Sequence, residues 1–180
     1  MKKAPALSTI CISLAAAMVA TAPALADMPR PGSCFVRLYD QAHLARNPQQ
    51  GVEALTVWFD RERDIAPLAM YVEAQMGWQG QARADGVAGM VLVQAALCDI
   101  NVPGACAVDC DGGNAVPRVQ ADGRLRLSTR YFRIEDPSGG CGGYEEPGSA
   151  PYSSLDEGQG GETVYLLHPA PVSACAGLMR

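Results

Sequence analysis

Alternating apolar and polar residues indicate that this chain is built mostly from β-strands. Over residues 52–61 the side chains follow a period of two, with Leu55, Val57 and Phe59 on one face and Trp58 on the other. Further segments of strand length lie at 68–76, 90–98, near Val116, at 125–129 and at 163–168. The spacing of these segments predicts about six strands joined by turns.

One short helix is predicted ahead of these strands. Asp40 is a suitable N-cap for a helix over residues 41–46, and Pro48 ends it. For residues 68–76 a helix stays an alternative to a strand, because Pro67 suits the first turn of a helix.

The fold class that follows is mainly β: a small antiparallel β-barrel or sandwich with one short N-terminal helix. No repeat of fixed period is present, and the turn signals favour an antiparallel meander over crossover helices. The apolar residues expected in the core are Leu55, Val57, Phe59, Met70, Val72, Val91, Val93, Leu125, Leu127, Tyr165 and Leu167.

The first 26 residues have the three parts of an export signal. Lys2 and Lys3 supply positive charge, residues 7–20 are an apolar stretch, and a small-x-small cleavage pattern ends at Ala26. The stretch is too short to span a bilayer comfortably, so we expect cleavage after Ala26 and not an uncleaved anchor. A periplasmic or secreted single domain over residues 27–180 is therefore expected, without membrane insertion after cleavage.

The net charge of the chain limits the kinds of molecule that it is expected to bind. The chain has 14 Lys+Arg against 19 Asp+Glu, and both lysines lie in the signal, so residues 27–180 carry a net charge of −7. Binding to nucleic acid needs an excess of positive surface charge. We therefore expect no nucleic-acid partner.

The cysteines predict a disulfide-bonded domain. Removing the signal removes Cys11 and leaves an even number, which in an oxidising compartment indicates three disulfides. Their connectivity stays open, although Cys34 is the natural partner of Cys175 near the carboxyl end. A four-thiolate metal site is the alternative, because Cys106 and Cys110 have a metal-ligand spacing. The six cysteines are Cys34, Cys98, Cys106, Cys110, Cys141 and Cys175.

Residues 135–162 form an unusual acidic segment. It contains eight Gly, three Pro, seven acidic residues and no Arg, so its net charge equals that of the whole exported chain. One interpretation is a solvated loop anchored by Cys141. The other is a partner-binding element for a basic protein such as a lysozyme-like hydrolase, with Tyr144, Glu145 and Glu146 as the contact residues.

Candidate catalytic residues are few. His43 and His168 remain after signal removal, and no partnered nucleophile or nucleophile elbow accompanies them. Asp109 and Asp111 begin like a calcium loop, but the later ligand positions are missing. A tight turn in which Gly112 and Gly113 take positive φ is the favoured interpretation.

Three arginines form a stripe along one predicted strand. Arg124, Arg126 and Arg130 share a face with Ser128 between them. Such a stripe can bind a carboxylate or phosphate. It can also be a solvated face paired with acids on the neighbouring strand, which is the commoner case.

Two local motifs resemble known groups of exported proteins. Tyr39-x3-His43-Leu44-Ala45-x2-Pro48-x-Gln50 and Cys110-Asp111-Gly112-Gly113 resemble an uncharacterised group of small exported proteobacterial proteins. This resemblance implies an exported, disulfide-bonded small β domain and transfers no activity. Ser138-Gly139-Gly140-Cys141-Gly142-Gly143-Tyr144 is faintly similar to the inhibitory loop of periplasmic lysozyme inhibitors, which are small β-barrels.

Function is expected to be binding and not catalysis. The chain lacks a recognisable catalytic constellation and has an unusual charged segment, so we expect a non-enzymatic binding or interaction protein without a cofactor. A small periplasmic enzyme using His43 or His168 and a structural envelope protein are the alternatives.

Overall fold

The computed structural model describes residues 28–62, 66–99, 104–109, 111–137, 150–157 and 161–179. The predicted export signal lies outside these residues. No helix within them has the length and apolar character needed to cross a membrane. The elements are β1 (Ser33–Leu38), α1 (Gln41–Arg46), β2 (Val52–Glu62), β3 (Ala66–Met76), α2 (Gly80–Ala84), β4 (Val91–Cys98), β5 (Cys106–Ala107), β6 (Gly113–Val119), β7 (Leu125–Glu135), β8 (Tyr152–Ser154), β9 (Thr163–Ala170) and the 3₁₀-helix η1 (Val172–Leu178).

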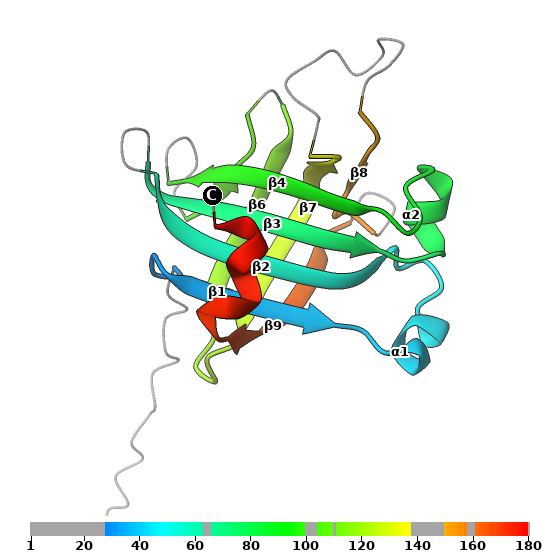
Figure 1. Ribbon diagram of the computed structural model, residues 1–180, viewed down its shortest axis with the longest axis horizontal. Coiled ribbons are helices and arrows are strands. Elements are labelled where there is room, and N and C mark those ends of the chain that lie inside the picture. The colour runs from blue at the N-terminus through cyan, green and yellow to red at the C-terminus, as the bar shows by residue number, and fades with distance from the viewer. Residues whose placement is uncertain are drawn as a thin grey trace, which may run out of the picture.

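The strands close into an antiparallel barrel (Figure 1). Neighbours run in the order β6, β5, β4, β3, β2, β1, β9 and β7, and β7 also pairs with β6, which completes a ring of eight strands. β8 pairs with the C-terminal part of β7. The predicted fold class is thereby confirmed, and residues 66–76 form a strand and not a helix.

Apolar side chains fill the interior of the barrel. All the predicted core residues are buried except Val91 and Val93. Val91 is 42% exposed, and the inward side chains of β4 are those of Leu92 and Ala96. The expected register of this strand was wrong by one residue, because an uninterrupted apolar run has no alternation to distinguish its two faces.

A second cluster lies on the outer face of the barrel. η1 crosses β1, β2 and β3 there, and Cys175 of η1 forms a disulfide with Cys34 of β1. Trp58 and Leu178 are buried with this disulfide, at 5% and 8% exposure. The predicted pairing of these cysteines is confirmed, and η1 is the reason that β2 is covered on its outer face.

A second disulfide joins Cys98 at the end of β4 to Cys106 of β5. The two residues are also cross-strand neighbours in the sheet. Cys110 and Cys141 lie outside the described residues, so the third disulfide stays a prediction.

Both α-helices lie at one end of the barrel (Figure 1). The predicted helix α1 is confirmed: the side chain of Asp40 caps it by accepting a hydrogen bond from the His43 amide (2.7 Å). Leu44 of α1 and Ala82 of α2 are buried. The helices therefore close this end of the apolar core.

Candidate functional site

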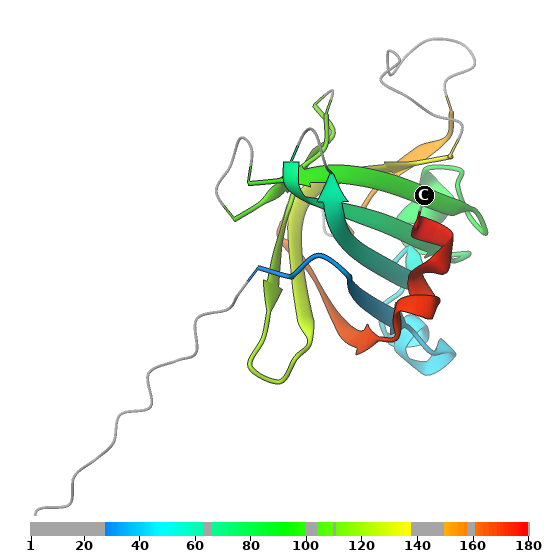
Figure 2. The ribbon, with the colours of Figure 1, turned by 60° about the vertical axis from the view of Figure 1, so that its left-hand side comes forward.

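The clearest candidate site is a groove on the outer face of β6 and β7. A tight turn joins the two strands: Gly123 has φ +81°, and the Asp122 carboxylate accepts a hydrogen bond from the Arg124 amide (3.1 Å). Asp122 and Gly123 are residues that favour such turns. Figure 2 shows this hairpin on the side of the barrel opposite η1.

A β-bulge in β7 shapes the groove. Ala115 pairs with Thr129 and Asn114 pairs with Tyr131, so Arg130 is an extra residue opposite the register shift in β6. Thr129 is buried before the bulge and Phe132 is buried after it. The bulge therefore places Arg130 and Tyr131 next to each other on the exposed side of the strand.

Gly113 allows the strands to approach at this bulge. A Cβ atom there would lie 2.1 Å from the Tyr131 carbonyl oxygen, and the residue has φ +81°. Only glycine fits both the backbone conformation and the space.

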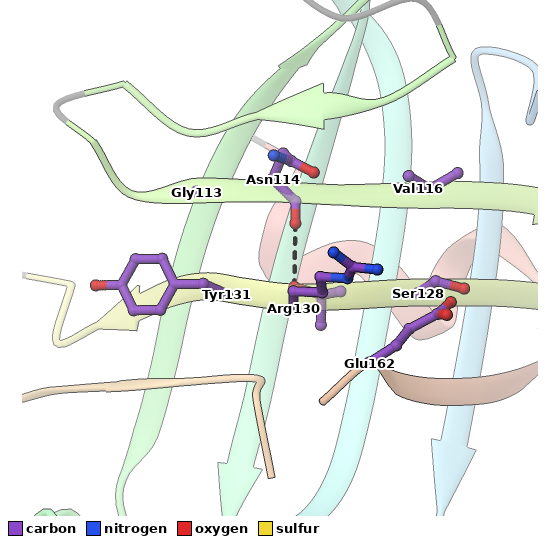
Figure 3. A pocket seen from close by; sticks show the side chains of 8 residues that line it. Gly113, Asn114, Val116, Ser128, Arg130, Tyr131 and Glu162 are labelled. Carbon is purple, nitrogen blue, oxygen red and sulfur yellow. Dashed lines mark hydrogen bonds between the residues drawn. The ribbon is translucent and has the colours of Figure 1, made fainter. Parts of the chain in front are cut away.

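The groove has a volume of about 430 Å³. Figure 3 shows Arg130 extending along β7 toward Ser128 and Glu162, with the Tyr131 ring pointing the other way. Residues from β6, β7 and the approach to β9 line it: Gly113, Asn114, Val116, Ser128, Thr129, Arg130, Tyr131 and Glu162.

Acidic side chains neutralise most of the positive charge of the predicted arginine stripe. Arg124 pairs with Asp122 (2.7 Å), and Arg126 pairs with Glu162 (3.2 Å) and donates to the Ser128 hydroxyl. Within the described part of the chain, Arg130 has no ion pair. The stripe is thus a mostly paired face, with one guanidinium left in the groove.

The positive charges in and next to the groove stabilise a negatively charged group. Hydrogen bonds from Ser128 and Arg126, and the nearby charge of Arg130, lower the pKa of Glu162. The guanidinium groups of Arg130 in the groove and of Arg126 next to it therefore both act on the Glu162 carboxylate, which balances only one of these two positive charges.

Several acidic side chains of the acidic segment are paired or partly buried. Glu135 forms an ion pair with Arg133 (2.9 Å), Glu162 pairs with Arg126, and Glu157 is partly buried. Part of the segment is also ordered as β8. Tyr144, Glu145 and Glu146, the predicted contacts for a basic partner, lie outside the described residues.

The Asp109 and Asp111 candidates lie in a tight turn. The Gly112 amide donates to the Asp109 carbonyl (3.2 Å). Asp111 has φ +59° and Gly113 has φ +81°, so the expected positive φ at Gly112 was wrong. Within the described ranges, no group of three or more His, Cys, Asp or Glu side chains could hold a metal ion.

Both histidines contact structural partners near α1. His43 Nε2 lies 2.9 Å from Gln50 Oε1, and its ring packs on Tyr39 with centroids 4.6 Å apart. His168 Nε2 lies 3.2 Å from an Arg37 guanidinium nitrogen, and Arg37 stacks on the same Tyr39 ring (4.9 Å). Neither histidine lines the groove on β6 and β7.

Sequence reasoning missed one titratable group, Glu157. Its Oε1 atom accepts hydrogen bonds from the backbone amides of Gly51 (2.9 Å) and Val52 (2.7 Å), where β2 begins. Burial raises the pKa of Glu157 to about 7, although these hydrogen bonds oppose the shift. Glutamate in an acidic, Gly-rich segment gives no sign of burial, so no local signal could have found it.

Comparison with the models of protein families, with curated proteins and with solved structures gives no match to this chain.

Proposed function

We propose that this chain is a non-enzymatic binding protein, working after export, that recognises its ligand on the outer surface of the barrel. The groove beside β7 supports this proposal best, because it combines a cation, hydroxyls, an amide and an exposed tyrosine. Tyrosine, serine and asparagine provide contact area and adaptable hydrogen bonds in many binding surfaces.

The packed interior also favours an outer site. Carrier barrels hold small ligands inside, which requires an interior volume. Here Phe59, Leu127 and Tyr165 are at most 1% exposed and belong to one continuous apolar core. Side chains occupy the space that an internal ligand would need.

The contacts of the histidines support binding over catalysis. Gln50 donates its amide to the Val52 carbonyl (2.7 Å), which turns its oxygen toward His43 and fixes the proton of that ring on Nε2. His168 Nε2 accepts from Arg37, so its lone pair is occupied. Among the residues that the structure describes, the contacts of the two rings include no nucleophile of the kind that acid–base catalysis activates.

Chemical-shift mapping tests this proposal. The ¹⁵N-labelled exported protein is titrated with a panel of short peptides and small saccharides, and each panel member is analysed for turnover. We expect shifts at Asn114, Ser128 and Tyr131 and no change in the panel members. Turnover that disappears in His43→Ala or His168→Ala would instead establish the enzymatic alternative.

A basic protein partner is a separate proposal that depends on Tyr144, Glu145 and Glu146. The acids at both ends of the segment are already paired with arginines, so an attraction would come mainly from its middle. We expect binding to a lysozyme-like hydrolase to weaken with salt and to be lost when Tyr144 becomes Ala and both glutamates become Gln. Equal binding by the variant would exclude this segment as the contact.

A further inference from the structure

Arg130 in the groove beside β7 and Arg126 next to the groove together carry one positive charge more than Glu162 can balance. Glu162 forms a direct ion pair with Arg126 and only a longer-range interaction with Arg130. Arg126 is further held by the hydroxyl of Ser128, which is 5% exposed. Of the two arginines, Arg126 is therefore held in place by Glu162 and Ser128, and Arg130 has the guanidinium group that is available to a ligand.

The surroundings of Arg130 are suited to a planar anion. A guanidinium presents parallel N–H donors that match the two oxygens of a carboxylate. In Figure 3 the Arg130 guanidinium lies along the groove, with Ser128 and Glu162 beyond it and Asn114 on the facing strand. The backbone carbonyl of Asn114 is already engaged by the Thr129 hydroxyl (3.0 Å), so its amide side chain is the polar group left to contact a ligand.

We propose that this groove binds a ligand through a carboxylate group, with Arg130 as the residue that holds it. This inference rests on the proposed function, because it assigns the ligand chemistry of the same groove. Glu162 makes the site selective for a single negative charge: a dianionic phosphate would bring a second charge close to this carboxylate. Tyr131, 41% exposed beside Arg130, provides a surface for the rest of the ligand.

Matched pairs of probes test the charge of the ligand. N-acetylglycyltyrosine is compared with its carboxamide, and glucuronic acid is compared with glucose, so that a peptide carboxylate and a sugar carboxylate are separated. Inorganic phosphate is the dianionic probe. Binding is followed by the amide shifts of Ser128, Arg130 and Tyr131 in the exported protein, at millimolar concentrations.

We expect at least one carboxylate probe to bind about tenfold more tightly than its neutral partner, since a charged hydrogen bond is worth this much. Arg130→Gln should remove that advantage, and Arg130→Lys, which keeps the charge but not the planar donor pair, should restore part of it. Arg124→Gln is the matched control, because Arg124 is a half-buried arginine paired with Asp122 outside the groove. It should bind as the parent does.

Several results would overturn the carboxylate assignment: equal binding of the neutral partners, undiminished binding by Arg130→Gln, tighter binding of phosphate, or no shift in the groove with any probe. Neutral probes that shift these same amides would leave the groove as a binding surface and refute only its ligand class. Shifts confined to other faces of the barrel would refute the proposed function as well.

Discussion

Glu157 should make the barrel less stable as the pH rises toward neutrality. Its carboxyl group lies beneath the start of β2, close to the Tyr165 hydroxyl and to Tyr39, and Asp156 precedes it in the chain. Burial raises the pKa of Tyr39 to about 12 and raises that of Tyr165 well above its ordinary value, so both stay neutral. Of the three groups here whose pKa is raised, only Glu157 therefore titrates near pH 7.

The direction of the pKa shift decides whether stability rises or falls with pH. Glu157 has a pKa of about 7 in the folded chain and 4.5 as an ordinary glutamate. Between these values the folded state binds more protons than the unfolded state, so stability is full below pH 4.5 and is lost as the pH rises through 7. At 1.36 kcal/mol for each pKa unit, the loss is about 3 kcal/mol. This is an upper value, because water can enter around a newly charged carboxylate.

Urea unfolding at pH 5.0 and pH 7.5 measures this loss, with Glu157→Gln as the comparison. The amide oxygen of glutamine can still accept from Gly51 and Val52, but it does not titrate. We expect the parent to lose about 2–3 kcal/mol between the two pH values and the variant to lose much less. All other groups are the same in both proteins, so the difference between the parent and the variant isolates the contribution of Glu157.

Glu162→Gln is the control for a general effect of removing an acid, because Glu162 is exposed and paired with Arg126. It should retain the pH dependence of the parent. If Glu157→Gln instead keeps the full loss of stability between pH 5.0 and 7.5, or if the parent gains stability over this interval, the Glu157 carboxyl is not the cause.

Three further experiments test the packing. Leu92→Ala should cost about 2–5 kcal/mol by urea unfolding, whereas Val91→Ala, on the exposed face of the same strand, should cost less than about 1 kcal/mol; the reverse order would contradict the register of β4. Gly113→Ala should destabilise by about 2 kcal/mol more than Gly123→Ala, because both have φ +81° but only Gly113 lies against backbone. Cys175→Ser should cost about 2–5 kcal/mol and increase the exposure of the η1 surface to a fluorescent apolar probe; an unchanged midpoint would exclude a stabilising role for this disulfide.

Short-range patterns were sufficient to predict the fold class. The alternation around Leu55 and Leu127 distinguishes inward from outward positions, and Asp40 identifies the start of α1. The register of β4 was not predictable, since both faces of an apolar run look alike. β1 was missed because its outward face is covered by η1, an element more than a hundred residues later in the chain.

The candidate site was predictable only in part. The sequence places Arg126 and Arg130 on one face of the strand. It does not show which of them pairs with an acid, because Glu162 reaches the groove from the approach to β9. The bulge is equally hidden: Arg130 and Tyr131 look like one outward and one inward position until the pairing with Asn114 is known. Burial of Glu157 depends on contact with the start of β2, which is remote in sequence.

The bulge couples the candidate site to the stability of the barrel. Before it, Leu125 and Leu127 point inward at odd positions; after it, Phe132 and Ile134 are inward at even positions and fully buried. A continuous strand would turn Phe132 outward and force Tyr131 into the core. The fold would then lose the free energy gained by burying the large apolar side chains of Phe132 and Ile134. The packing of Phe132 and Ile134 therefore holds Arg130 and Tyr131 together at the surface. A binding site positioned in this way needs no mobile loop to form it.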